Sequence, residues 1–331
     1  MREIIERRSA LLAENQRIMC KNFRFEHSLT NAVAAAAYAE KDKAVDVDLL
    51  KEAKKLLKER KGIFSEFRSY AEIMISAKMA LSGKPGEYME ELFDVYDRLK
   101  KGRIFGSSYK VLAAMSIVDQ GKYSEADRLI DKMYELLKGM KKEHPFLTSD
   151  EDTCFAVLLA MIDKSVEDIL TEIEQSYQIL KKNISFHDNA IYSLAQVLTA
   201  FDGSAEEKCE RALGLLKAFK DAGAKYGKEY ELASLGALTD IDADKDEIVS
   251  EIIEVSGFLK GKKGFGMFDM GRETRLMFGT MLVSGSYLSG EGKTNTSAIG
   301  GEIGRVVALQ TAILITMMVI ITTTTVASSS H

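Results

Sequence analysis

Two kinds of apolar pattern alternate along the first 289 residues of the chain. One kind is almost uniformly apolar and rich in small residues, as in NAVAAAAYA at 31–39 and CFAVLLAMI at 154–162. The other kind places apolar residues three and four positions apart among charged ones, as in VEDILTEIEQSYQILKK at 166–182. The first pattern is typical of a buried helix and the second of an amphipathic surface helix. The sequence therefore predicts buried helices that alternate with half-exposed ones.

Aromatic residues mark an internal repeat, because they recur about every forty residues, a period typical of helical repeat proteins. Each follows the end of an amphipathic segment, where Lys-rich sequence with Gly or Asn indicates that a helix ends. The series is Phe23, Phe64, Phe105, Phe146, Phe186, Tyr226 and then Phe265 or Phe268. The whole chain has only 2 prolines, so few positions break a helix.

A two-helix unit of this kind cannot bury its apolar face alone, so neighbouring units must stack. We predict an all-α fold, a right-handed α/α repeat superhelix of about six two-helix units that is either an open solenoid or a closed α/α toroid. The predicted parts are an N-terminal capping helix at 1–22, the repeat domain at 23–289, a polar linker at 290–305 and an uncharged apolar, Thr- and Ser-containing tail at 306–331.

The charge, the cysteines and the absence of known motifs each exclude a class of function. The net charge of -5 comes from 45 basic and 50 acidic side chains that are mixed along the chain, so no basic face for nucleic acid is expected. Cys20, Cys154 and Cys209 form no CxxC pair and indicate reduced thiols in a cytosolic protein. The sequence has no GxSxG, HExxH, Walker or dinucleotide motif. We therefore expect no cofactor, and the chemistry does not favour an enzyme.

The acidic run TDIDADKDEIVSE at 239–251 has two interpretations. A weak calcium-loop pattern places oxygen ligands at Asp240, Asp242, Asp244, Asp246 and Glu251. The loop would need Gly where Lys245 stands, and a dedicated metal site is therefore not predicted. The favoured interpretation is a turn between helices, in which Asp244 or Asp246 caps the next helix and Glu247 lies in its first turn.

Polar side chains also follow the aromatic residues, at the predicted beginnings of the buried helices. Repeat symmetry places these segments on one edge of the assembly, where helix N-termini attract anions. They give a candidate pocket that contains Arg68, Asp150, Asp152, His187, Asp188, Glu229 and Arg272. Helix capping is the competing explanation for most of these residues.

The end of the chain differs in composition from the rest. Val306 to Val326 is 21 residues without a charge, and Arg305 precedes it. That length spans a membrane when helical, but Gln310 and four consecutive threonines weaken insertion. Three possibilities stay open for 306–326, namely a membrane anchor, a segment that closes the last groove of the superhelix or meets a partner, and an unstructured terminus.

With HPFLTSDEDTCFAVLLA at 144–160, the repeated aromatic positions and the uncharged tail, the chain resembles a bacterial family, domain of unknown function 4003. The resemblance covers nearly the whole length, although this tail has Ile, Met and Thr where that family has Ala, Gln and Ser. It implies a bacterial, Gram-positive setting and no catalytic residues.

We predict a cytoplasmic binding or scaffold module for a protein or peptide, with no nucleic-acid partner. One alternative is an enzyme that uses Asp150, Asp152, His187 and Glu229 in a common cavity. A further alternative is an adaptor held at a membrane by residues 306–326. The sequence leaves the oligomeric state open.

Overall fold

The computed structural model describes residues 1–60, 66–67, 71–101, 106–266 and 269–287. In these ranges every regular element is helical, which confirms the all-α prediction. None of the helices in these ranges combines the length and the apolar character needed to cross a membrane. The predicted linker and tail, together with Arg68, lie outside the described residues.

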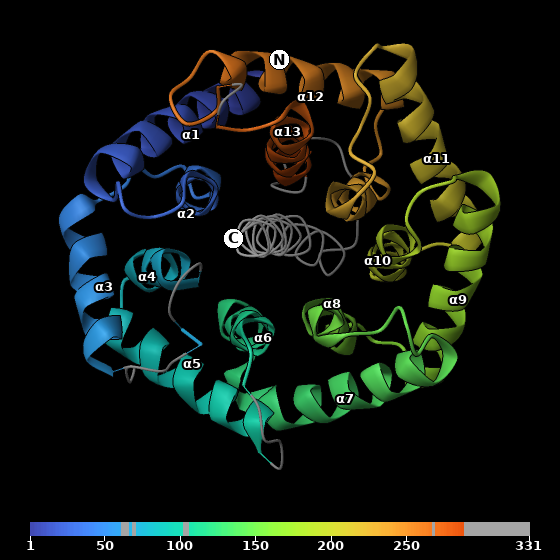
Figure 1. Ribbon diagram of the computed structural model, residues 1–331, viewed down its shortest axis with the longest axis horizontal. Helices are drawn as coiled ribbons and strands as arrows, with labels where there is room; N and C mark the ends of the chain where they lie inside the picture. The colour runs from blue at the N-terminus through green and yellow to red at the C-terminus, as the bar shows by residue number, and fades with distance from the viewer. Residues whose placement is uncertain (61–65, 68–70, 102–105, 267–268, 288–331) are drawn as a thin grey trace, which may run out of the picture.

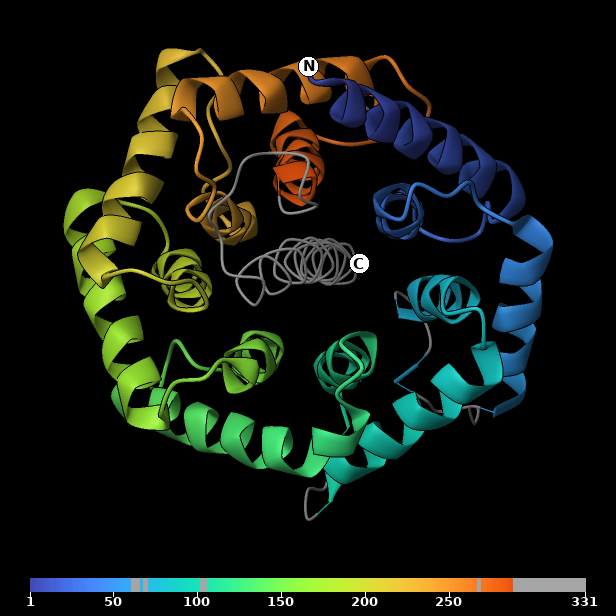
Figure 2. The same cartoon turned by 180° about the vertical axis from the view of Figure 1, so that it is seen from behind.

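The helices lie in two concentric layers around a common centre (Figure 1). The outer layer contains α1 (Glu3–Asn22), α3 (Val47–Arg60), α5 (Pro85–Lys100), α7 (Ala126–Glu143), α9 (Val166–Asn183), α11 (Ala205–Asp221) and α12 (Lys245–Lys260). The inner layer contains α2 (Ser28–Glu40), α4 (Glu72–Leu81), α6 (Ser108–Asp119), α8 (Thr153–Met161), α10 (Asp188–Thr199), the 3₁₀ helix η4 (Tyr230–Leu238) and α13 (Arg272–Ser286). Two short 3₁₀ helices, η2 (Tyr123–Glu125) and η3 (Asp150–Asp152), precede α7 and α8. Figure 2 shows the same two layers from behind.

The two layers correspond to the two apolar patterns. In α8, every residue from Thr153 to Ala160 is buried, so this inner helix is covered on all sides. In α7, burial is limited to positions three and four apart, such as Met133, Leu136 and Met140, and charged residues cover the rest. Apolar content on every side suits an inner helix, and a single apolar stripe suits an outer one.

The first helix of the chain lies beside the last ones. Helix α1 packs against α2, its partner in sequence, and also against α12 and α13. Arg2 joins them, because its Nε donates to Glu251 Oε1 over 2.8 Å and its Nη2 donates to Ser286 Oγ over 2.8 Å. Its guanidinium also lies 3.6 Å from the centre of the Tyr287 ring. A bidentate Arg–carboxylate pair with a cation–π contact fixes the relative position of the two ends of the ring.

The segment around the acidic run has one predicted and one unexpected feature. Asp244 caps α12, since its Oδ1 accepts from the backbone N–H groups of Asp246 and Glu247, as predicted. The preceding apolar segment forms the 3₁₀ helix η4 instead of an α-helix. A Cβ at Gly236 would lie 2.5 Å from Val197 Cγ1, so this position permits η4 to pack closely on α10.

Candidate functional site

A large open groove of about 1280 Å³ runs along α7. The end of α5, the beginning of α6 and the connection from α7 to α8 form its other walls. Its charged lining residues carry both signs, and these are Arg98, Lys101, Lys110, Asp127, Asp131, Glu135, Lys138, Lys141 and Asp150. Arg98 pairs with Asp127, and Lys110 pairs with Asp150. The groove is thus a polar surface of mixed charge, which is unlike the uniformly basic surface that binds nucleic acid.

The connection from α7 to α8, residues 144–152, forms one wall of the groove and is fixed by hydrogen bonds at both ends. Lys141 Nζ donates to the carbonyls of Pro145, over 2.5 Å, and Thr148, over 2.7 Å. The backbone N–H groups of Leu147 and Thr148 donate to the His144 carbonyl. At the other end, Ser149 and Asp152 form a capping box. We call residues 144–152 the α7–α8 connection.

Phe146, in the middle of this connection, is 96% exposed. Other aromatic residues at this position of the repeat are buried, for example Phe23, Tyr226 and Phe265. The periodicity of aromatic positions could not identify this residue as a site, because it treats every member of the series alike. The Pro145 that precedes it is the one signal that sets this repeat apart.

His144 anchors the first end of the α7–α8 connection. Its Nε2 lies 2.6 Å from Glu174 Oε2, and its ring meets the edges of Tyr177 and Tyr192 at centroid distances of 5.0 Å. Partial burial alone would raise the pKa of Glu174, but hydrogen bonds from His144 and Gln178 outweigh it and lower that pKa. The imidazole therefore acts as a polar and aromatic anchor between α7, α9 and α10.

Asp152 anchors the second end and is a buried carboxyl group. Its oxygens accept from the Ser149 N–H over 2.7 Å and from Gln196 Nε2 over 2.6 Å. Desolvation raises its pKa to about 6, although these hydrogen bonds oppose the shift. Gln196 Oε1 is buried and has no hydrogen-bond partner. The two donors stabilise the ionised carboxylate and burial opposes it, and burial is the larger effect.

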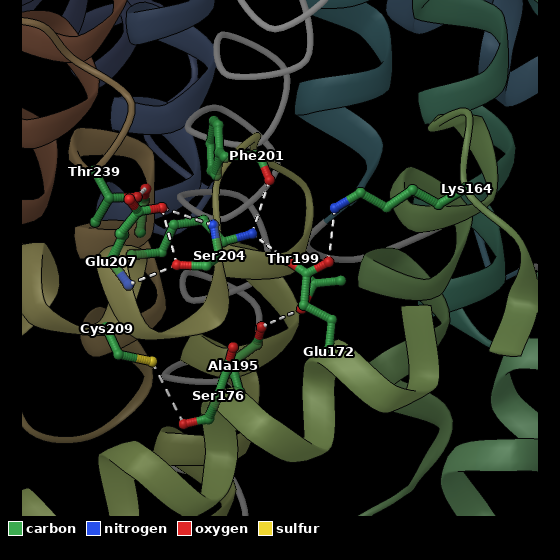
Figure 3. Close-up of polar contacts among 12 residues, drawn as sticks. Lys164, Glu172, Ser176, Ala195, Thr199, Phe201, Ser204, Glu207, Cys209 and Thr239 are labelled. Atoms are coloured by element: carbon green, nitrogen blue, oxygen red, sulfur yellow. Dashed lines mark hydrogen bonds and ion pairs between the residues drawn. The ribbon is translucent and has the colours of Figure 1, made fainter. Parts of the chain in front are cut away.

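A second buried polar network joins α9 to α11 (Figure 3). Lys208 Nζ forms an ion pair with Glu172 and donates to the Phe201 carbonyl over 2.8 Å. Glu172 also pairs with Lys164, over 2.7 Å, as Figure 3 shows. Burial lowers the pKa of Lys208 despite its partner carboxylate. The amine is held by two acceptors inside the wall of the ring, so its role is to join the helices.

The predicted candidate pocket is divided among separate places. Asp150 lines the groove, whereas Asp152 is buried beside Gln196. His187, Asp188 and Glu229 do lie together, in a shallow pocket of about 300 Å³.

In that shallow pocket, His187 Nε2 is 3.2 Å from Glu229, and both side chains are mostly exposed. Asp188 pairs with Lys181 over 2.9 Å. Arg272 lies elsewhere and donates to the Gly223 carbonyl over 3.0 Å. The described members of the set therefore do not converge on one cavity.

The acidic run is also divided. Asp244 caps α12, and Glu251 is held by Arg2 at the junction of the ring. Asp240 lines a pocket of about 680 Å³ together with Lys208 and Arg211, and desolvation raises its pKa. Asp242 and Asp246 are exposed. Within the described ranges, no group of three or more His, Cys, Asp or Glu side chains could hold a metal ion.

The three cysteines are free thiols in the structure. Cys154 and Cys209 are buried and Cys20 is partly buried. Burial raises the pKa of the Cys209 thiol to about 11, so it is protonated and unreactive at neutral pH.

These features define a class, namely an all-helical ring protein with an open groove of mixed charge and a fixed loop that exposes one aromatic side chain. Within that class, the chain belongs to the family described as protein of unknown function (DUF4003), whose model matches residues 16–322. The match confirms the resemblance carried by HPFLTS and the repeated aromatic positions. No curated protein and no solved structure matches the chain.

Proposed function

We propose that the protein is a non-enzymatic binding module whose partner is a protein or peptide, and that the α7–α8 connection with its groove is the binding site. We also propose that the ring is a closed α/α superhelix, an architecture that suits a binding role. In this arrangement six two-helix units begin at α2, and the capping helix α1 pairs with α13 to complete the circle. A bacterial cytoplasm, the setting that the family resemblance implied, belongs to the same proposal.

The observation that carries the proposal is the full exposure of Phe146 on a backbone that is already fixed. Single exposed apolar residues are common on protein surfaces and by themselves indicate nothing. Phe146 differs because Lys141, His144 and Asp152 hold the loop on either side of it. A preorganised aromatic side chain loses little entropy on binding, and aromatic anchors of this kind dominate many protein interfaces.

The groove beside the connection supports a peptide or protein segment as the partner. Its lining carries both cationic and anionic side chains, so it suits a chain that carries both charges and does not suit a polyanion. The separation of Asp152 from His187 and Glu229 weighs against the alternative of an enzyme with a common acidic cavity.

Site-specific cross-linking tests the proposal. A photoreactive p-benzoylphenylalanine replaces Phe146 in cells, and the same residue replaces Phe25, which is 90% exposed, as the control. We expect one discrete adduct from position 146 and none from position 25. The partner is then identified by mass spectrometry and produced in pure form for the binding measurement.

The binding measurement compares Phe146→Ser with the native protein by isothermal titration calorimetry. The loss of the aromatic anchor should weaken binding by about 2 kcal/mol, a typical effect for such an anchor. The stability of the variant should equal that of the native protein, because Phe146 is 96% exposed. Equal affinity for both proteins, or adducts of equal yield at both positions, would refute this site.

A further inference from the structure

The inner helices are covered on every side. Each residue from Leu29 to Ala39 in α2 and from Val111 to Val118 in α6 is buried, as is each residue from Thr153 to Ala160 in α8. Eight consecutive residues make more than two turns, so they point in every direction around the helix axis. Apart from Thr30, Asn31, Ser116 and Thr153 these residues are apolar, so the side of these helices that faces the centre of the ring is largely apolar.

The described neighbours account for only part of this coverage. Inner helices pack against outer ones, as α8 does against α7, and against the next inner helix, as α6 does against α8. Helices on opposite sides of the ring, such as α2 and α8, are not among the pairs of described helices that pack closely (Figure 1). An apolar side toward the centre needs an apolar partner there, because it would otherwise face water.

The number of inner helices sets the size of that centre. Every neighbouring pair of inner helices except α4 and α6 packs closely. Helices in contact have axes about 9 to 10 Å apart, so seven of them in a circle place each axis at least roughly 11 Å from the middle. Since each helix is about 10 Å wide, the free space is roughly 12 Å across, which matches the width of one more helix. The centre thus has room for one apolar segment.

The same chain contains such a segment. Helix α13 ends at Ser286 within the inner layer, and Val306 follows Tyr287 after 18 intervening residues, 288–305. An 18-residue stretch of Gly- and Ser-containing sequence has an average span of roughly 24 Å, which is enough to reach the middle of the ring from the end of any inner helix. The 21 residues from Val306 to Val326 carry no charge, which a water-free centre requires. The family model extends to residue 322 and thus includes most of this segment.

We propose that the inner helices form a docking surface around the centre of the ring, and that its occupant is the chain's own segment 306–326. In this proposal the segment supplies the apolar partner that the inner helices need at the centre of the ring. This assignment explains why the inner helices are apolar on every side and why the tail has no charge. It is independent of the binding site at Phe146.

Cross-linking in the full-length protein tests the contact directly. A photoreactive p-benzoylphenylalanine replaces Met317 inside the segment, and the same residue replaces Ser329 beyond it as the control. Mass spectrometry of the monomer should find Met317 adducts on peptides from α2, α6, α8 or α10, with a yield at least five times that of Ser329. Adducts between two copies of the chain, or none on the inner helices, would overturn the proposal.

A charge substitution gives a second measure that does not depend on cross-linking. Ile315→Asp puts a carboxylate into the segment, and Ser329→Asp puts one outside it. We expect Ile315→Asp to lower the melting temperature and to raise the fluorescence of the apolar dye anilinonaphthalene sulfonate several-fold, whereas Ser329→Asp leaves both unchanged. If Ile315→Asp does not fold, the cross-linking result decides the question.

The competing occupant of segment 306–326 is a lipid bilayer, and vesicle flotation separates the two. The full-length protein is mixed with vesicles of phosphatidylethanolamine and phosphatidylglycerol and centrifuged through a density gradient. We expect the protein to stay at the bottom, like a variant that ends at Arg305. Flotation of the native protein but not of the shortened variant would overturn the proposal.

Discussion

Two connections that lead from an outer helix to an inner one show how differently the same repeat position is held. The α7–α8 connection is anchored by His144 on Glu174 and two tyrosine rings, and by buried Asp152 on Gln196. In the connection from α9 to α10, His187 and Glu229 pair on the surface, where both are mostly exposed. Similar residue types thus give a rigid platform in one unit and a weak surface pair in the other, because only the first set is desolvated.

The largest expected difference between the two connections is in their pH dependence. Asp152 has a pKa of about 6 in the folded protein, above the ordinary 3.8, so the folded state holds its proton more tightly than the unfolded state does. Its contribution to stability is therefore complete below pH 4 and is lost as the pH rises through 6, by about 3 kcal/mol in all. Chemical denaturation from pH 4 to pH 7 should show this loss in the native protein and not in Asp152→Asn.

The matched change in the other connection is Asp188→Asn, whose carboxylate lies in a half-exposed pair with Lys181. The unfolding free energy of Asp188→Asn should change with pH in the same way as that of the native protein. If Asp152→Asn and the native protein keep a constant difference in unfolding free energy across this range, Asp152 is ionised throughout and the account of the buried acid is wrong.

The second comparison removes the two histidines one at a time. His144→Ala deletes the contacts with Tyr177 and Tyr192 and removes one of the two hydrogen-bond partners of Glu174, so it should lower the free energy of unfolding by about 2 kcal/mol. His187→Ala should change it by less than about 0.5 kcal/mol, since an exposed pair contributes little. Urea denaturation at pH 7 measures both, and equal effects would remove the distinction between a rigid and a weakly held connection.

Among the residues that hold the α7–α8 connection, Lys141 should have the smallest effect on stability. Lys141→Met keeps much of the side-chain length but removes the donor to the Pro145 and Thr148 carbonyls, which should cost about 1 kcal/mol. Amide hydrogen exchange in 144–149 should become faster at the same time. Lys142→Met, one position along the same helix, is the control and should leave exchange in this segment unchanged. Unaltered exchange in Lys141→Met would show that the backbone of the connection is held without the ammonium group.

Much of the helical architecture could be predicted from periodicity, because apolar spacing records which sides of a helix are buried. The sequence shows the alternation of amphipathic segments such as α7 with apolar segments such as α8. It also shows the N-terminal cap of α12 at Asp244. The 3₁₀ geometry of η4 was not predictable, since it accompanies a close approach of Gly236 to Val197 on a neighbouring helix. That neighbour lies about forty residues earlier in the chain, one repeat away.

The candidate site was predicted only in part. The polar residues before the inner helices were identified, but repeat symmetry alone could not say which of them share a cavity. His187 and Glu229 meet across neighbouring units, while Asp150 and Asp152 are separated by the turn of η3 that buries one and exposes the other. The exposure of Phe146 could not be predicted, because the aromatic series compares residue types and contains no information on the path of the backbone.

The sequence by itself determined the helical class, the period of about forty residues and the division into apolar and amphipathic helices, because these depend on local side-chain patterns. Tertiary structure alone decided that Arg2 meets Glu251 and that Asp152 meets Gln196. It also decided that Phe146 faces solvent. These outcomes depend on distances between segments that are remote in the chain, and burial then sets the pKa of each acid and the strength of each pair.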